Sequence, residues 1–171
     1  MVEQETPQIR ERKGDFGREY TDRNVLDPEA LDRLYLDNYG VSRTELNRGF
    51  LEGIPLDAQI LEVGCNVGNQ LLPLQRSGYK SLYGIEIQKY AVDRAQQRVP
   101  RGTVLEGSAL EIPYPDQHFD LVFTSGVLIQ MAPQNLPKVL GRFIEPQRRG
   151  SGDLNTTRML PPRWYIAALP E

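Results

Sequence analysis

The sequence predicts an α/β protein with a doubly wound, mostly parallel sheet. Between residues 56 and 143, short apolar runs alternate with segments in which apolar residues recur at helical spacing. The first run, Gln59–Val63, has the composition of a strand that is buried on both faces. Alternating strands and helices form parallel sheets that helices cover on both sides, and right-handed crossovers make such sheets doubly wound.

Two helices are expected before the sheet, after a polar and irregular stretch over residues 1–24. The first follows Asp27, which can serve as the N-cap. Pro28 then occupies the first helical position, where its missing N–H costs nothing. The second follows Ser42, because Ser42 and Glu45 have the spacing of a capping box.

The elements of the sheet follow in alternation. The predicted strands and helices are Gln59–Val63, Gly68–Arg76, Ser81–Ile85, Lys89–Val99, Thr103–Leu105, Phe119–Phe123 and Gln134–Phe143. The rest of the chain is polar and rich in Pro, Gly and Arg, and only Arg163–Leu169 has the pattern of a strand. We therefore divide the chain into an N-terminal segment of lid and helices (1–55), a core (56–143) and an atypical tail (144–171).

Length and composition limit the classes of protein to consider. The 171 residues suffice for one domain, and the formal net charge of −3 offers no electrostatic footprint for nucleic acid or a membrane surface. Cys65 is the only cysteine, which fits a reducing compartment such as the cytoplasm. No apolar run approaches the roughly 18 residues of a membrane-spanning helix. The sequence does not indicate an oligomeric state.

The loop after the first strand indicates a ligand site. The stretch LEVGCNVGNQL (61–71) carries Glu62, Gly64 and Gly68 in an E-x-G-x-x-x-G pattern, where dinucleotide-binding loops read G-x-G-x-x-G. Parallel sheets bind ligands at the carboxyl ends of their strands, and glycine permits a tight turn and the close approach of a ligand. A glycine pair alone would equally suit a plain strand–helix turn.

Three polar features describe the ligand that this loop would hold. Glu62 would repel a pyrophosphate and attract an ammonium group. Glu86 ends the second strand 22 residues after Gly64, a spacing typical of a carboxylate that accepts ribose hydroxyls. Ser108 and Ala109 follow the third strand, where they can meet an adenine edge. An adenosine with a cationic amino-acid tail and no phosphate fits all three, which indicates S-adenosylmethionine as the cofactor.

The chain also resembles a known family. LEVGCNVGNQL, YGIEIQ, GSALEIPYPDQHFDLVF and TSGVLIQM are similar to the ordered motifs of class I S-adenosylmethionine-dependent methyltransferases. More narrowly, GDFGREYTDRN and GVLIQM resemble the methyltransferases associated with pseudaminic acid biosynthesis. The resemblance implies a Rossmann-like fold and methyl transfer to a small-molecule acceptor, such as a sugar or sugar-nucleotide intermediate.

The resemblance implies a place for each residue around the cofactor. The methionine portion would be enclosed by Glu62, Gly64, Cys65, Asn66 and Gly68. The nucleoside would be held by Glu86 at the ribose, Ile87 at the adenine ring, and Ser108 and Ala109 at the adenine amino edge. The floor near the sulfonium would consist of Thr124, Ser125, Gly126 and Val127. The candidates for a lid are Phe16, Tyr20 and Arg23.

The sequence departs from this family at three points. Ser108 stands where many members have Asp, and Gln130 stands where a histidine is common. A complete sheet of the family has seven strands, whereas this chain offers four clear strands and one further candidate. The C-terminal strands are therefore expected to be incomplete, as in a truncated or frame-altered chain.

No catalytic residue is identified from the sequence. It contains no Ser–His–Asp set, no metal-ligand cluster and no phosphate-binding Walker loop. The only histidine, His118, lies in a turn, where a solvated role is more common than a catalytic one. Two alternatives to a methyltransferase stay open. One is a truncated protein that binds S-adenosylmethionine without catalysis. The other is an NAD-dependent oxidoreductase, which fits Glu86 but not the glycine loop.

Overall fold

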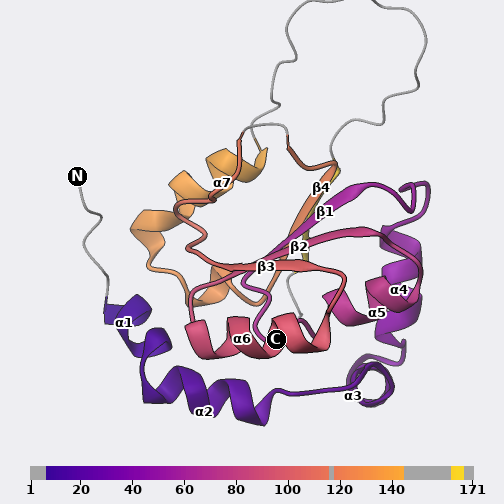
Figure 1. Cartoon of the computed structure of the whole chain (residues 1–171), viewed down its shortest axis with the longest axis horizontal. Helices are drawn as coiled ribbons and strands as arrows, with labels where there is room; N and C mark the ends of the chain where they lie inside the picture. The colour runs from indigo at the N-terminus through magenta and orange to yellow at the C-terminus, as the bar shows by residue number, and fades with distance from the viewer. Residues whose placement is uncertain (1–6, 116–117, 145–162, 168–171) are drawn as a thin grey trace, which may run out of the picture.

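The computed structural model describes residues 7–115, 118–144 and 163–167. It confirms the α/β class and the doubly wound parallel sheet (Figure 1). Every neighbouring pair of strands is parallel, and the strand order is β3-β2-β1-β4-β5. The strands are β1 Gln59–Val63, β2 Ser81–Glu86, β3 Thr103–Glu106, β4 Leu121–Ser125 and β5 Arg163–Ala167. The order reverses between β1 and β4, which is where such sheets bind ligands.

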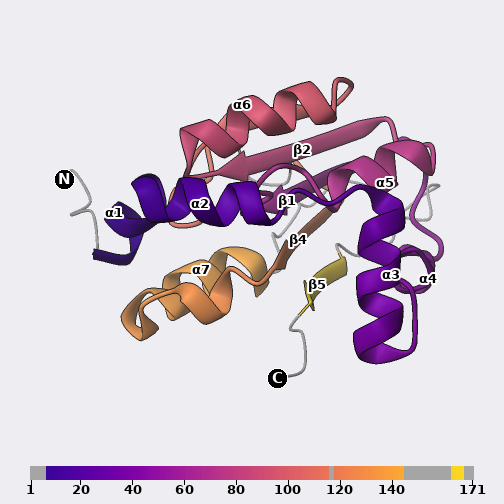
Figure 2. The ribbon, with the colours of Figure 1, turned by 90° about the horizontal axis from the view of Figure 1, so that it is seen from below.

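Helices cover both faces of the sheet (Figure 2). Helices α5 (Leu71–Arg76) and α6 (Lys89–Arg98) lie on one face, and α7 (Leu136–Ile144) lies on the other. Side chains alternate along each strand, so Ile60 joins the core beneath α5 and α6 while Leu61 joins the core that includes Val139 of α7. Burial of each such side chain stabilises the fold by about 2 kcal/mol.

From residue 7 onward, four helices precede the sheet: α1 Pro7–Lys13, α2 Asp15–Arg23, α3 Pro28–Tyr39 and α4 Arg43–Phe50. The predicted caps of α3 and α4 are confirmed. Asp27 Oδ1 accepts a hydrogen bond from Ala30 N at 2.6 Å, and Ser42 and Glu45 form the reciprocal capping box. The hydrogen bonds that Glu45 accepts from the Ser42 side chain and backbone lower the pKa of its carboxyl group.

The prediction of an irregular stretch over residues 1–24 is wrong for α1 and α2. Helix α2 has no side-chain cap, so the local sequence gives no start signal. Contacts with the rest of the fold hold it instead. Thr21 Oγ1 bonds Asn66 Oδ1 at 3.0 Å, and Tyr90 Oη bonds Asp22 Oδ1 at 2.8 Å.

Several element boundaries also differ from the prediction by one to three residues, and the reason is clear for two of them. Helix α5 begins at Leu71 and not at Gly68, because Asn66 and Gly68 have φ angles of 45° and 75°, outside the helical region. Strand β4 begins at Leu121. Asp120, just before it, accepts a hydrogen bond from Gln59 N at 2.9 Å through its carboxylate and ties the starts of β1 and β4 together.

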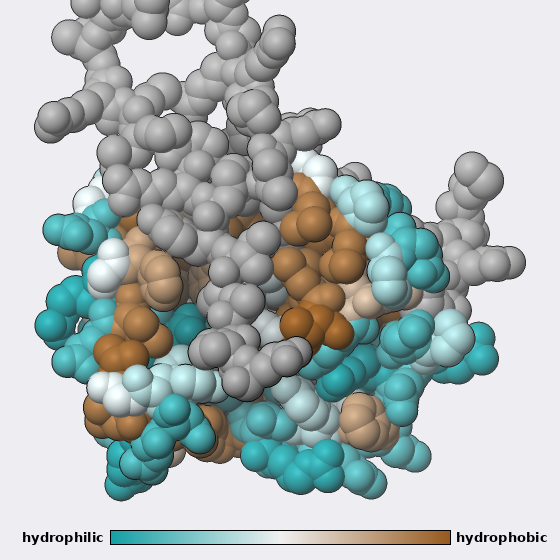
Figure 3. All heavy atoms as spheres, turned by 180° about the vertical axis from the view of Figure 1, so that it is seen from behind, coloured by the Kyte–Doolittle hydropathy of each residue, from teal (hydrophilic) through white to brown (hydrophobic). Residues whose placement is uncertain are grey.

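The C-terminal segment contributes one strand to the described structure. Strand β5 pairs in parallel with β4, within the only part of the tail that the sequence marked as strand-like. Residues 145–162 and 168–171 lie outside the described residues, so the expectation of incomplete C-terminal strands stays a prediction. No helix in the described ranges is long and apolar enough to span a bilayer. From behind, hydrophobic side chains reach the surface on either side of the grey atoms (Figure 3).

Candidate active site

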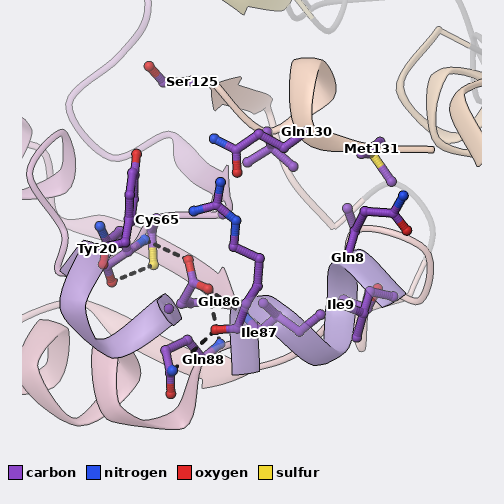
Figure 4. A pocket seen from close by; sticks show the side chains of 18 of the residues that line it. Gln8, Ile9, Tyr20, Cys65, Glu86, Ile87, Gln88, Ser125, Gln130 and Met131 are labelled. Atoms are coloured by element: carbon purple, nitrogen blue, oxygen red, sulfur yellow. Dashed lines mark hydrogen bonds between the residues drawn. The ribbon is translucent and has the colours of Figure 1, made fainter. Parts of the chain in front are cut away.

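A cavity of about 240 Å³ opens at the carboxyl ends of β1, β2, β3 and β4. The loops that leave these strands form its floor, and helices α1 and α2 form a wall on the other side (Figure 4). Tyr20 comes from α2, whereas Gln8 and Ile9 come from α1. The predicted site residues at the strand ends therefore face helices α1 and α2, which lie in the stretch that was predicted to be irregular.

The loop after β1 turns sharply so that its backbone faces the cavity. Gly64 has a φ of 75°, a left-handed conformation that disfavours any side chain. A Cβ atom at this position would overlap Val127 Cγ2 from the loop after β4. The N–H groups of Gly64 and Cys65 both donate to Ile85 O, at 2.8 and 3.1 Å. Glycine is thus required both by the turn and by the close approach of the two loops.

Glu62 places a buried carboxylate beside this loop. It is 2% exposed, and its Oε2 has no hydrogen-bond partner within the described structure. Burial raises the pKa of Glu62 well above its ordinary value; Arg43 opposes this effect and Glu86 adds to it. An unpaired buried acceptor is costly, and a ligand cation would supply the missing donor.

Gln70 presents a second unpaired acceptor to the same cavity. The residue is the N-cap of α5 and is 7% exposed, and its Oε1 also has no partner within the described structure. The sequence analysis did not identify it, because a glutamine at the start of a helix is common. Together with Glu62, it makes this part of the cavity a site for a hydrogen-bond donor.

Glu86 organises the neighbouring part of the floor. Its carboxylate accepts hydrogen bonds from Asn66 N (2.9 Å), Ile87 N (2.8 Å) and Gln88 N (3.0 Å). Burial raises its pKa, while these three bonds and the nearby Arg12 guanidinium work in the opposite direction. A carboxylate has about four lone-pair directions, so room is left for a further donor such as a ribose hydroxyl.

Arg12 brings a positive charge to the cavity wall. Its guanidinium carbon lies 4.6 Å from the ring centroid of Tyr20 and 5.2 Å from that of Phe16. This geometry is typical of cation–π contacts. The sequence analysis missed Arg12, because nothing in its local pattern shows that α1 lies across the strand ends.

A comparison with protein families agrees with this geometry. A family described as "Methyltransferase domain" matches residues 60–150, which is more than half of the chain. The chain belongs to the class I S-adenosylmethionine-dependent methyltransferase family. The matched region starts in β1 and includes the glycine loop, Glu86 and the loop after β4.

Curated relatives are longer than the chain itself. An uncharacterized methyltransferase of Synechocystis sp. PCC 6803 is 28% identical over 126 residues, which cover 72% of this chain and 53% of the relative. An uncharacterized methyltransferase of Anoxybacillus flavithermus is 25% identical over 91 residues, which cover 53% of this chain and 42% of the relative. The chain therefore spans about half the length of the curated relatives that it matches.

Solved methyltransferase structures share the fold. Magnesium protoporphyrin IX methyltransferase from Synechocystis PCC 6803, crystallised with S-adenosylhomocysteine, has a TM-score of 0.59 at 18% identity, with 78% of this chain and 64% of that chain covered. A TehB-like methyltransferase from Corynebacterium glutamicum has a TM-score of 0.55 at 19% identity, with 74% and 64% covered. The narrower likeness to methyltransferases of pseudaminic acid biosynthesis is not tested by these comparisons.

Ten of the eleven residues predicted to contact the cofactor line the cavity. They are Tyr20, Glu62, Gly64, Cys65, Asn66, Glu86, Ile87, Ser108, Ala109 and Ser125. Gly68 does not line it. With a φ of 75°, Gly68 turns the chain into α5, and a Cβ there would lie 2.7 Å from Val99 Cγ2 of the residue that caps α6.

Other residues named from the resemblance divide in the same way. Gly126 and Val127 line the cavity floor as expected. Thr124 instead bonds Val63 O through its hydroxyl at 2.8 Å and joins two strands. Phe16 lies beneath the Arg12 guanidinium and is 43% exposed, and Arg23 pairs with Glu19 on the surface of α2.

Two residues with reactive side chains, His118 and Cys65, do not supply a general base. His118 stacks on Tyr114 with 5.3 Å between ring centroids, inside an aromatic cluster outside the cavity. Burial raises the pKa of the Cys65 thiol well above its ordinary value, which suppresses the nucleophilic thiolate. No general base can therefore be named among the residues that the structure describes.

Proposed function

We propose that this chain transfers a methyl group from S-adenosylmethionine to a small-molecule acceptor. The observation that carries the proposal is the unpaired, buried Oε2 of Glu62, a residue that lines the cavity together with Gly64. An ammonium group supplies the donor that this carboxylate lacks. A diphosphate would bring negative charge to the same place, which argues against a nicotinamide cofactor.

The residues present fit this cofactor. Glu62, Gly64 and Asn66 would surround the methionine portion, and Glu86 would take a ribose hydroxyl. Ile87, Ser108 and Ala109 would enclose the adenine. When bound, the cofactor supplies an electrophilic methyl group. The protein aligns the acceptor atom with that group and excludes water, which is the main contribution that positioning makes to rate.

The acceptor side supports a neutral, hydroxyl-bearing molecule. Gln130 and Met131 lie opposite Gln8 and Ile9 across the cavity (Figure 4). Carboxamides donate and accept hydrogen bonds, so they can match hydroxyl groups, while the apolar pair packs against carbon faces. With the likeness to methyltransferases of pseudaminic acid biosynthesis, this supports a sugar or sugar-nucleotide acceptor.

The composition supports the same proposal. The formal net charge of −3 favours a small molecule over a nucleic acid as the acceptor. A single cysteine, Cys65, is buried with its thiol protonated, which suits a reducing cytoplasm. We therefore infer a cytoplasmic enzyme with no nucleic-acid partner.

Ligand binding followed by turnover tests the proposal. Thermal-shift titration should show stabilisation by S-adenosylmethionine and S-adenosylhomocysteine and none by NAD. Production of S-adenosylhomocysteine with a panel of sugars and nucleotide sugars then separates an enzyme from a protein that binds the cofactor without catalysis. Stabilisation by NAD alone would overturn the proposal.

A further inference from the structure

Gln88 joins helix α6 to the corner between α1 and α2. It lines the cavity and is 6% exposed. Its Oε1 accepts a hydrogen bond from Tyr90 N at 3.1 Å and so caps α6. Its Nε2 points the other way, toward the carbonyl oxygens of Arg12, Lys13 and Gly14, each at 3.2 Å.

The orientation of this amide follows from its partners. The N–H of Tyr90 can only donate, so it needs the amide oxygen. The three backbone carbonyls can only accept, so they need the amide nitrogen. Two N–H hydrogens are thus shared among three acceptors at the end of α1. One side chain therefore provides hydrogen-bond partners for backbone groups at both the start of α6 and the end of α1.

The corner has room for this amide only because Gly17 has no side chain. A Cβ on Gly17 would overlap Arg12 O and would lie 3.0 Å from Gln88 Nε2. Anchoring the backbone of Arg12 keeps its side chain at the cavity wall, where the guanidinium lies above Tyr20. Both sides of the corner therefore reach the cavity, α1 through Arg12 and α2 through Tyr20.

Gln88 also contacts Glu86, the residue that is expected to hold the ribose. Gln88 N donates to Glu86 Oε1 at 3.0 Å, two residues from the carboxylate that would hold the sugar. We propose that Gln88 is a positioning residue, which anchors the α1–α2 corner over the bound cofactor and so slows its release. This inference rests on the proposed function. The anchor is distinct from the cap, because the two use opposite ends of the amide.

Substitutions can separate the two roles. Gln88→Glu keeps an oxygen for Tyr90 N but faces the three carbonyls with a second acceptor. Gln88→Ser keeps a good N-cap residue that is too short to reach the corner. Gln88→Ala removes both. Tyr90→Phe is the control, since it removes a bond between α6 and α2 outside the cavity, Tyr90–Asp22, together with the Arg94–Tyr90 bond within α6.

The experiment measures binding and release of S-adenosylhomocysteine by stopped flow, at about pH 8 so that the introduced carboxyl is ionised. We expect both Gln88→Glu and Gln88→Ser to release the ligand about tenfold faster, as for loss of one or two hydrogen bonds. Association should change less than about twofold, because steering charges outside the cavity are untouched. Amide exchange over residues 7–23 should rise in both variants, and Tyr90→Phe should release the ligand at the wild-type rate.

Other outcomes overturn the inference. Wild-type release from Gln88→Glu and Gln88→Ser, with faster release from Gln88→Ala alone, would assign the residue to capping only. If the wild-type protein binds no S-adenosylhomocysteine, the proposed function fails. In that case, amide exchange over residues 7–23 in the unliganded variants still tests whether Gln88 anchors the α1–α2 corner. Unchanged exchange in Gln88→Glu and Gln88→Ser would refute this role.

Discussion

Gly64 and Val127 approach so closely at the cavity floor that a Cβ atom on Gly64 would overlap Val127 Cγ2. The loop after β1 and the loop after β4 therefore meet where strand order reverses.

Gly64→Ala should destabilise the fold and remove cofactor binding. The left-handed φ of 75° costs about 1–2 kcal/mol for alanine, and displacing Val127 adds about 1–3 kcal/mol. Gly40→Ala is the control, because Gly40 has a φ of 71° with nothing within 4 Å of an added Cβ. Denaturant unfolding should show the smaller cost alone for Gly40→Ala, with normal binding. Equal effects at both positions would contradict the role of the contact.

Glu62→Gln should weaken binding of S-adenosylhomocysteine about tenfold or more, because it removes the charged acceptor for the ammonium group. Binding of 5′-methylthioadenosine, which has no amino-acid tail, should stay within about twofold of wild type by calorimetry. An equal loss of affinity for both ligands would mean that Glu62 does not contact the amino-acid tail.

The raised pKa of Glu62 predicts a pH dependence of stability. The folded protein holds this proton more tightly than the unfolded chain does. The free energy of unfolding therefore falls as pH rises from the unfolded pKa to the folded pKa of Glu62. In the unliganded protein at neutral pH, Glu62→Gln should raise the melting temperature by about 2 °C or more.

Ligand affinity should depend on pH in the opposite direction to stability. Affinity for S-adenosylhomocysteine should increase as pH rises through the folded pKa of Glu62, since its ammonium pairs with the ionised carboxylate. Titrations that run upward from the ordinary pKa of a glutamate, within the range where the ligand amine stays charged, should show this in wild type and not in Glu62→Gln. The same dependence in both proteins would refute the assignment.

Glu86→Ala should weaken binding of both S-adenosylhomocysteine and 5′-methylthioadenosine, by about 2–3 kcal/mol, because both carry the ribose. It should also destabilise the protein by about 1–3 kcal/mol, since three N–H groups lose their acceptor. Glu86→Gln keeps one oxygen and should cost less on both counts. Unchanged affinity in Glu86→Ala would mean that the sugar lies elsewhere.

Local rules accounted for most of the core. The caps at Asp27 and Ser42, the strands of the sheet and the glycine at position 64 each follow from a residue and its near neighbours. The position of Glu86 followed as well, because a carboxylate directly after a buried parallel strand lies at the ligand-binding edge. These features depend on hydrogen bonds and φ angles within a few residues.

The sequence by itself determined the doubly wound α/β class and the family, and most of the site residues that it indicated do line the cavity. Only the tertiary structure decided that residues 7–23 form helices across the strand ends, that Arg12 and Gln70 reach the cavity, and that Gly68 does not. The physical reason is the range of the contacts. Gln88 bonds Arg12 O across 76 positions, and such a contact leaves no periodicity or cap in either segment.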